Sequence, residues 1–235
     1  MRLSDLIQNL VYGPLSELGA FGEGNGSISP DKLPQLMVRI NSAIEALYTR
    51  FPLQVRTLTL ETVSGLYHYP LRREFAQTSA SDELHKFIKD TPADPFKGDV
   101  LMVTSVMDDQ MFALPFNDNE DGCHWFKSSY DTLSYDNPKT PETFYVEYRA
   151  RHERFPLLPE PDDEFEVRIP ASLELALMSH VAGHVYGNMD MEGSKVKSMN
   201  HLQTYENECM FHEERNTFNQ WSADSSRDIR KNGWV

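Results

Sequence analysis

The hydrophobic pattern of this 235-residue chain changes its period twice, and this limits the possible fold more than any other feature. Near both ends, apolar residues recur every three or four positions, which places them on one face of a helix. Between about residues 53 and 168, stretches of alternating apolar and polar residues are typical of half-buried strands. The sequence therefore predicts an α+β fold, in which N- and C-terminal helices form one bundle around an inserted β-rich region.

The strongest helical pattern runs from Ser29 to Phe51. Ser29 can cap such a helix, Pro30 suits its first position, and Pro52 lies just beyond its end. Because its apolar residues recur at helical spacing, they should form one stripe that packs against other helices. The stripe consists of Leu33, Leu36, Met37, Ile40, Ile44, Leu47, Tyr48 and Phe51.

The same spacing predicts three further helices. One covers residues 3–11, and another begins near Ile169 and ends near Gly187. A last, long helix is expected from about residue 192 to residue 220. Its apolar side is predicted to consist of Val196, Met199, Leu202, Tyr205 and Cys209.

The β-rich region begins with alternating residues over 55–60, followed by two tyrosines over 67–69, which together predict a hairpin. Residues 81–89 are predicted to form a short helix, because three apolar residues there share a face. Further strands are expected where β-branched and aromatic residues gather. They cover residues 100–106, 110–116 and 144–148.

These patterns divide the chain into bundle helices (1–52 and 169–220), a β-rich insertion (53–168) and an extended C-terminal arm (221–235). The arm is polar and has no period, which predicts disorder in the free protein. It nevertheless contains aromatic and cationic residues of the kinds that anchor interfaces. We expect it to contact a partner or a neighbouring subunit through Trp221, Arg227, Ile229, Arg230, Lys231, Trp234 and Val235.

Charge and composition argue against several classes of protein. The formal net charge is -14, so the chain should repel nucleic acid unless its basic groups gather on one surface. No apolar run suggests a membrane helix and no secretory signal is evident, which predicts a protein that stays in the cytoplasm where it is made. Cys123 and Cys209 lie in unrelated contexts, so neither a disulfide nor a paired-cysteine zinc site is expected.

The best candidate for chemistry is the pair His180 and His184, whose spacing puts both imidazoles on one helical face, as in many zinc sites. Zinc peptidases with this spacing need a glutamate directly after the first histidine, and Val181 stands there. We therefore interpret the pair as structural, with a metal-dependent hydrolase as an alternative. No phosphate-binding loop or nucleophile elbow is evident. We expect no catalytic residue, no cofactor and no metal.

Two regions of the chain carry a resemblance to a known family. The first is a helix over Leu33–Phe51 that leads directly into strand residues Val55–Leu60. The second consists of Val167–Leu177 and His180–Tyr186, followed by a helix with Tyr205 and Glu206. Both are patterns of packing residues rather than a catalytic signature, and they resemble the head-to-tail adaptor, or connector, family of tailed bacteriophages, of the short-tailed type.

The resemblance implies a virion structural protein that is made in the host cytoplasm and assembled into the neck of the particle. Such a protein docks as a ring, matching a twelve-fold portal protein, joins the portal to the tail nozzle, and lines the channel for double-stranded DNA. An acidic chain suits that channel, because groups that bind phosphate would hold the DNA. A tail nozzle or tail completion protein, and a binding module without a virion role, are the alternatives.

Overall fold

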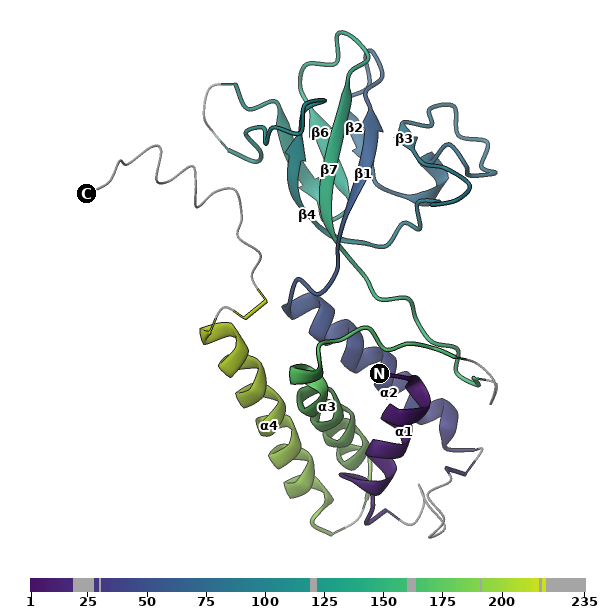
Figure 1. The fold of residues 1–235 in the computed structure, drawn as a ribbon, viewed down its shortest axis with the longest axis vertical. Coiled ribbons are helices and arrows are strands. Elements are labelled where there is room, and N and C mark those ends of the chain that lie inside the picture. The colour runs from purple at the N-terminus through teal and green to yellow at the C-terminus, as the bar shows by residue number, and fades with distance from the viewer. Residues whose placement is uncertain are drawn as a thin grey trace, which may run out of the picture. The chain divides into compact units, whose positions relative to one another are not determined.

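The computed structural model describes residues 1–18, 28–29, 31–118, 122–159, 164–190, 192–215 and 217–218. It contains helices and two antiparallel sheets, so the protein has an α+β fold, as predicted. The chain divides into two compact units (Figure 1). We call Met1–Leu53 with His152–Asn219 the helical unit, and Gln54–Arg151 the β unit.

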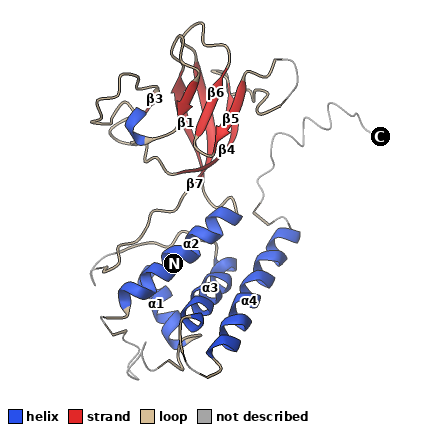
Figure 2. Cartoon of the chain, turned by 180° about the vertical axis from the view of Figure 1, so that it is seen from behind, coloured by secondary structure: helices blue, strands red, loops and turns tan. Residues whose placement is uncertain are grey.

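The described part of the helical unit contains four α-helices (Figure 2). Helix α3 packs against both α2 and α4, and a short 3-10 turn leads into it. The four helices predicted near the two ends of the chain are present, although α4 ends before residue 220. The helices are α1 (Leu3–Tyr12), α2 (Leu33–Arg50), α3 (Glu174–Gly187) and α4 (Ser194–Glu214).

Helix α2 begins later than the sequence predicts. Lys32 is its N-cap residue, and Pro34 lies in the first turn, where a missing amide hydrogen costs little. The carbonyl oxygen of Ser29 accepts hydrogen bonds from the amides of Lys32 and Leu33 at 2.8 and 3.3 Å, so a turn precedes the helix. The predicted cap at Ser29 is therefore wrong, whereas the predicted end at Phe51 is confirmed.

The predicted apolar side of α4 is only partly correct. Tyr205 and Cys209 are buried, but Val196 is 61% and Met199 71% exposed. The buried face carries Ser194 and small or polar residues instead. This helix packs closely on α3, and close packing selects small side chains over large apolar ones.

Residues 152–168 group with the helices, although the predicted boundary placed them in the β-rich insertion. Main-chain hydrogen bonds attach this segment to the N-terminus: Leu3 N donates to Phe165 O at 2.9 Å, and Val167 N donates to Met1 O at 2.8 Å. The ring of His152 also packs edge-on against Tyr48, with 5.3 Å between centroids. The described parts of this segment, residues 152–159 and 164–168, are thus held on the helical unit, and we call them the strap. Short-range sequence patterns do not reveal this role.

The β unit contains two sheets with antiparallel neighbours. The first sheet has the order β3-β1-β7-β4 and the second the order β2-β6-β5. Strands β4 and β7 confirm the strands predicted at residues 100–106 and 144–148. The strands are β1 (Val55–Glu61), β2 (His68–Pro70), β3 (Ile88–Lys89), β4 (Val100–Met107), β5 (Trp125–Ser129), β6 (Thr132–Tyr135) and β7 (Thr143–Ala150).

One hydrophobic core joins the two sheets. Leu60 and Val146 from the first sheet are buried together with Leu133 and Trp125 from the second. The indole of Trp125 stacks on Tyr135, with 4.5 Å between ring centroids and an interplanar angle of 20°. Such aromatic pairs add stabilisation beyond the area they bury.

Two predictions for the β unit are wrong because pairing between distant strands overrides the local pattern. Strand β1 pairs with β3 and β7, whereas residues 68–70 pair with β6 in the other sheet, so no hairpin forms. The helix predicted over residues 81–89 is absent, because Ile88 pairs with Leu60 as part of β3. Leu84, expected on the buried face of that helix, is 86% exposed.

The strand predicted over residues 110–116 is also absent. Only isolated bridges form there, from Ala113 to Met107 and from Phe116 to Trp125. Met111 has a φ of 64°, which lies in the left-handed region and interrupts any extended strand. Strands β5 and β6, which the sequence did not predict, provide much of the second sheet.

Candidate functional site

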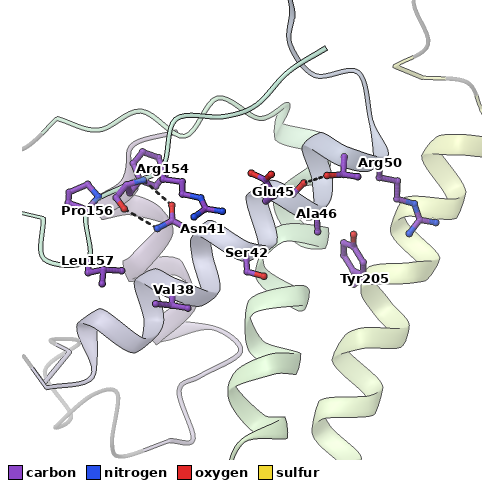
Figure 3. A pocket seen from close by; sticks show the side chains of 12 residues that line it. Val38, Asn41, Ser42, Glu45, Ala46, Arg50, Arg154, Pro156, Leu157 and Tyr205 are labelled. Carbon is purple, nitrogen blue, oxygen red and sulfur yellow. Dashed lines mark hydrogen bonds between the residues drawn. The ribbon is translucent and has the colours of Figure 1, made fainter. Parts of the chain in front are cut away.

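A groove of about 860 Å³ lies along helix α2 of the helical unit (Figure 3). Its walls are the outward face of α2, the strap residues 154–157, and Tyr205, which points from α4 toward α2. The exposed lining is mostly apolar and includes the partly exposed side chains of Val38 and Leu157. The groove is open to solvent.

The sequence of α2 explains why this helix can serve both a core and a groove. Its buried residues, such as Leu36, Ile40 and Leu47, repeat at helical spacing on one face. Val38 and Ser42 are also four positions apart, but they lie on the exposed face and line the groove. A single long helix therefore presents one surface to the protein interior and another to solvent.

Asn41 fixes the strap that forms the outer wall of the groove. Its side-chain nitrogen donates to the carbonyl oxygen of Phe155 at 3.0 Å, and its side-chain oxygen accepts from the Phe155 amide at 2.9 Å (Figure 3). The Phe155 ring is buried beside His152, with 5.0 Å between centroids. These contacts turn an irregular segment into a fixed wall and leave Leu157 exposed at its edge.

A cluster of charged residues joins α2 to α4 at one end of the groove. The guanidinium of Arg50 binds both carboxylate oxygens of Glu213, at 2.7 and 2.9 Å, and one oxygen of Glu206 at 2.7 Å. The hydrogen bond to Glu213 raises the pKa of Arg50, and the same bond lowers the pKa of Glu213. Burial raises the pKa of the adjacent Tyr205 to about 12, so its hydroxyl keeps its proton near neutral pH.

The groove lining offers both apolar and charged contacts to a side chain or chain segment. Tyr205 is a poor base or nucleophile while it holds its proton. The Thr49 hydroxyl donates to the carbonyl oxygen of Glu45 at 2.8 Å, within its own helix. The exposed Arg154 is a cation on the strap, where an anionic partner group can reach it.

The histidine pair predicted on α3 lies at the contact between α3 and α4. The rings of His180 and His184 are 4.5 Å apart, and His180 also meets the ring of Tyr205 edge-on at 4.8 Å. Burial, and next the nearby His184, lower the pKa of His180 to about 4. The Nδ1 atom of His180 is buried without a hydrogen-bond partner. In the described parts of the chain, no group of three or more His, Cys, Asp or Glu residues could hold a metal ion.

The predicted interface residues Trp221, Arg227, Ile229, Arg230, Lys231, Trp234 and Val235 lie outside the described residues. The groove residues Asn41, Arg154 and Leu157 were not predicted as a site, because nothing in the local pattern shows that the strap returns to α2. Cys123 and Cys209 are both buried and free, in agreement with the prediction of no disulfide.

Comparison with protein-family models and with curated proteins finds no match to this chain. None of the helices within the described ranges combines the length and the apolar character needed to cross a membrane.

Proposed function

We propose that this protein is a structural subunit of a tailed-phage virion. It acts as a head-to-tail adaptor that docks as a ring of twelve copies beneath the portal protein, joins the portal to the tail nozzle, and lines the DNA channel. Its role is assembly rather than catalysis, in agreement with a groove suited to binding and a histidine pair packed between helices.

The observation that carries this proposal is the packing of two distant segments in one unit. The segments that resemble adaptors, Leu33–Phe51 and Val167–Tyr186, are separated in sequence by the whole β unit. Their helices α2 and α3 nevertheless pack together. The hydroxyl of Tyr48 donates to the carbonyl oxygen of Arg168 at 2.6 Å and links the two segments directly.

This arrangement supports the proposal that helices from both ends of the chain act as one bundle that carries the β unit as an insertion. Because α2 leads into β1 and β7 leads back through the strap, the β unit is tethered to the bundle by two chain segments. A bundle with a tethered insertion gives an adaptor two separate surfaces, one for each neighbour along the neck. The net charge of -14 suits a channel that must release DNA.

Residues 221–235 are part of the proposal as an assembly arm toward the portal or a neighbouring subunit. Aromatic anchors such as Trp221 and Trp234, with three cationic residues, are well suited to binding an acidic partner. Deleting the arm should leave thermal unfolding of the isolated subunit nearly unchanged and abolish docking to portal-bearing heads. A truncated protein that melts several degrees lower, yet still docks, would contradict the arm's role.

The proposal is tested by mass spectrometry of purified tailed phage particles whose genome encodes this protein. We expect the protein at a stoichiometry close to that of the portal protein. Its absence from intact particles, together with its presence in the soluble fraction of infected cells, would rule out a virion role.

A further inference from the structure

A short turn after β4 holds two large apolar side chains in solvent. Met111 is 54% exposed and its neighbour Phe112 is 65% exposed. Exposed apolar surface that gathers at one place is a candidate contact surface. We call Met111 and Phe112 the knob.

The knob is held in a fixed shape by the carboxylate of Asp108. Its Oδ1 atom accepts hydrogen bonds from the amides of Gln110 and Phe112, at 2.9 and 2.8 Å. The main chain closes the same turn, because Asp108 N donates to Phe112 O at 3.0 Å and Met111 N donates to Asp108 O at 3.1 Å. Four hydrogen bonds therefore fix a segment whose side chains point away from its own core.

The turn also keeps Met111 in an unfavourable backbone conformation. Its φ of 64° lies in the left-handed region, which residues with a long side chain rarely adopt. Such strain persists only where surrounding contacts determine the conformation, and it occurs most often at binding and catalytic sites. A knob that is rigid before binding loses little conformational entropy when a partner covers it.

The groove along α2 offers a surface of matching chemistry. Val38, Ala46 and Leu157 provide apolar contacts there, and the exposed Arg154 lies on the strap. The knob follows directly after the exposed Asp109, so an anionic group accompanies the apolar pair. Apolar side chains thus meet an apolar lining, and a carboxylate can meet a guanidinium.

We propose that the knob of one subunit docks into the α2 groove of the next copy of the chain. A contact between two different surfaces of identical subunits is heterologous, and repeated contacts of this kind close into a ring when the rotation permits. The inference rests on the proposed function in one respect, because the adaptor role requires such a ring. It adds the residues through which neighbouring subunits recognise each other.

Disulfide trapping between two differently tagged full-length variants tests this contact. Gln110→Cys places a thiol beside an intact knob, and Ser42→Cys places one in the groove with little change in size. Both natural cysteines are buried, so they compete little for oxidation. Mixed under mild oxidation, the two variants should form several-fold more mixed dimer than Leu84→Cys mixed with Ser42→Cys. Leu84 is the matched control, because it is also exposed and apolar and lies in the same unit.

Two further variants separate a specific contact from random collision. Phe112→Asp in the Gln110→Cys protein should reduce the mixed dimer to the level of the Leu84 control. Asp109→Arg should weaken the cross-link, and Arg154→Asp in the groove partner should restore it. Equal yields for Gln110 and Leu84, or a Phe112→Asp variant that still cross-links fully, would overturn the docking. A weakened cross-link that Arg154→Asp does not restore would overturn the pairing of Asp109 with Arg154.

The outcome is independent of the test of the adaptor role. A specific cross-link in a protein that is missing from phage particles would keep the contact and remove the adaptor function. A protein present in particles but without this cross-link would keep the function and remove the proposed contact.

Discussion

Each of the two units is stabilised internally by a different kind of contact. The β unit buries large rings, with Trp125 packed against Tyr135 and edge-on against Phe144 at 4.9 Å. In the helical unit, α3 and α4 instead approach closely through small and polar residues. Ser198, for example, donates its buried hydroxyl to the carbonyl oxygen of Gly183 at 2.7 Å. The β unit therefore depends on the volume of its side chains, whereas the contact between α3 and α4 depends on side chains that are small.

The units also differ in the pH range in which they should weaken. In the helical unit, burial lowers the pKa of His180, which is stable there only as the neutral ring. In the β unit, burial alone would raise the pKa of Asp131, but hydrogen bonds from Ser129, Arg72 and Thr132 outweigh burial and lower this pKa from its usual value. A carboxylate with a lowered pKa contributes stability that is lost only as the pH falls through its folded-state pKa. Acid should therefore weaken the helical unit first.

Trp125→Ala should produce the largest loss of stability in the β unit. The side chain is 1% exposed, and its removal leaves a large cavity between the sheets. Loss of a buried aromatic of this kind costs about 3–5 kcal/mol. Hydrogen exchange at increasing urea concentrations should show a lower free energy of unfolding in strands of both sheets. Trp125→Phe should lose clearly less stability than Trp125→Ala. Equal losses for the two variants would show that ring volume does not hold this unit together.

Acidification should weaken the helical unit between about pH 6.5 and pH 4, because of His180. In that range the unfolded chain binds a proton that the folded protein excludes, so stability falls as pH falls. The full effect is about 3 kcal/mol. The ring of His180 contacts His184 of its own helix and Tyr205 of the facing helix α4. The charge of Glu206 favours the protonated form of His180, but it is the smallest of the effects on this pKa.

His180→Phe keeps an aromatic ring against Tyr205 but cannot titrate, so it is the matched control. Urea unfolding followed by helical circular dichroism should show a much smaller acid loss in this variant. The acid loss that comes from His152, His184 and His201, whose pKa values burial also lowers, should remain. An unchanged acid loss in His180→Phe would contradict this account of the helical unit.

Gly183→Ala should destabilise the contact between α3 and α4 by about 1–2 kcal/mol. An added Cβ would lie 2.7 Å from Cγ of Leu202, and this clash outweighs the higher helix propensity of alanine. Leu202→Ala in the same protein should relieve the clash and recover part of the loss, as measured by thermal unfolding. If Gly183→Ala alone stabilises the protein, close approach is not what this contact requires.

Arg50→Lys should have the smallest effect, less than about 1 kcal/mol, because its partners Glu206 and Glu213 are partly exposed. A lysine cannot reproduce the two parallel bonds to Glu213. Thermal unfolding in low and high salt should show a difference that shrinks with salt. Thr49→Ser, an exposed change one residue away, is the control and should have no such salt dependence.

The sequence predicted helices more reliably than strands, for a physical reason. The apolar stripe of α2 is encoded within eighteen neighbouring residues, so its periodicity is visible locally. The partners of β1 are β3 and β7, and β7 lies far along the chain, so alternation alone could not identify them. The short strands β5 and β6 carry too few residues for a clear period.

The groove could not be predicted for a similar reason. The outward residues of α2, such as Val38 and Ser42, look like an ordinary exposed helical face. Only the return of the strap, held by Asn41 and Phe155, encloses that face. The histidine pair was visible from its spacing, but its packing against Tyr205 depends on how α4 lies on α3.

We propose that the protein forms a ring in the neck of a tailed phage. A cryo-electron microscopy map of the neck of purified particles tests it most directly. The account predicts a ring of twelve copies between the portal and the tail nozzle, into which the helical unit and the β unit fit as separate bodies. A neck resolved to side-chain detail and fully accounted for by other chains would contradict it.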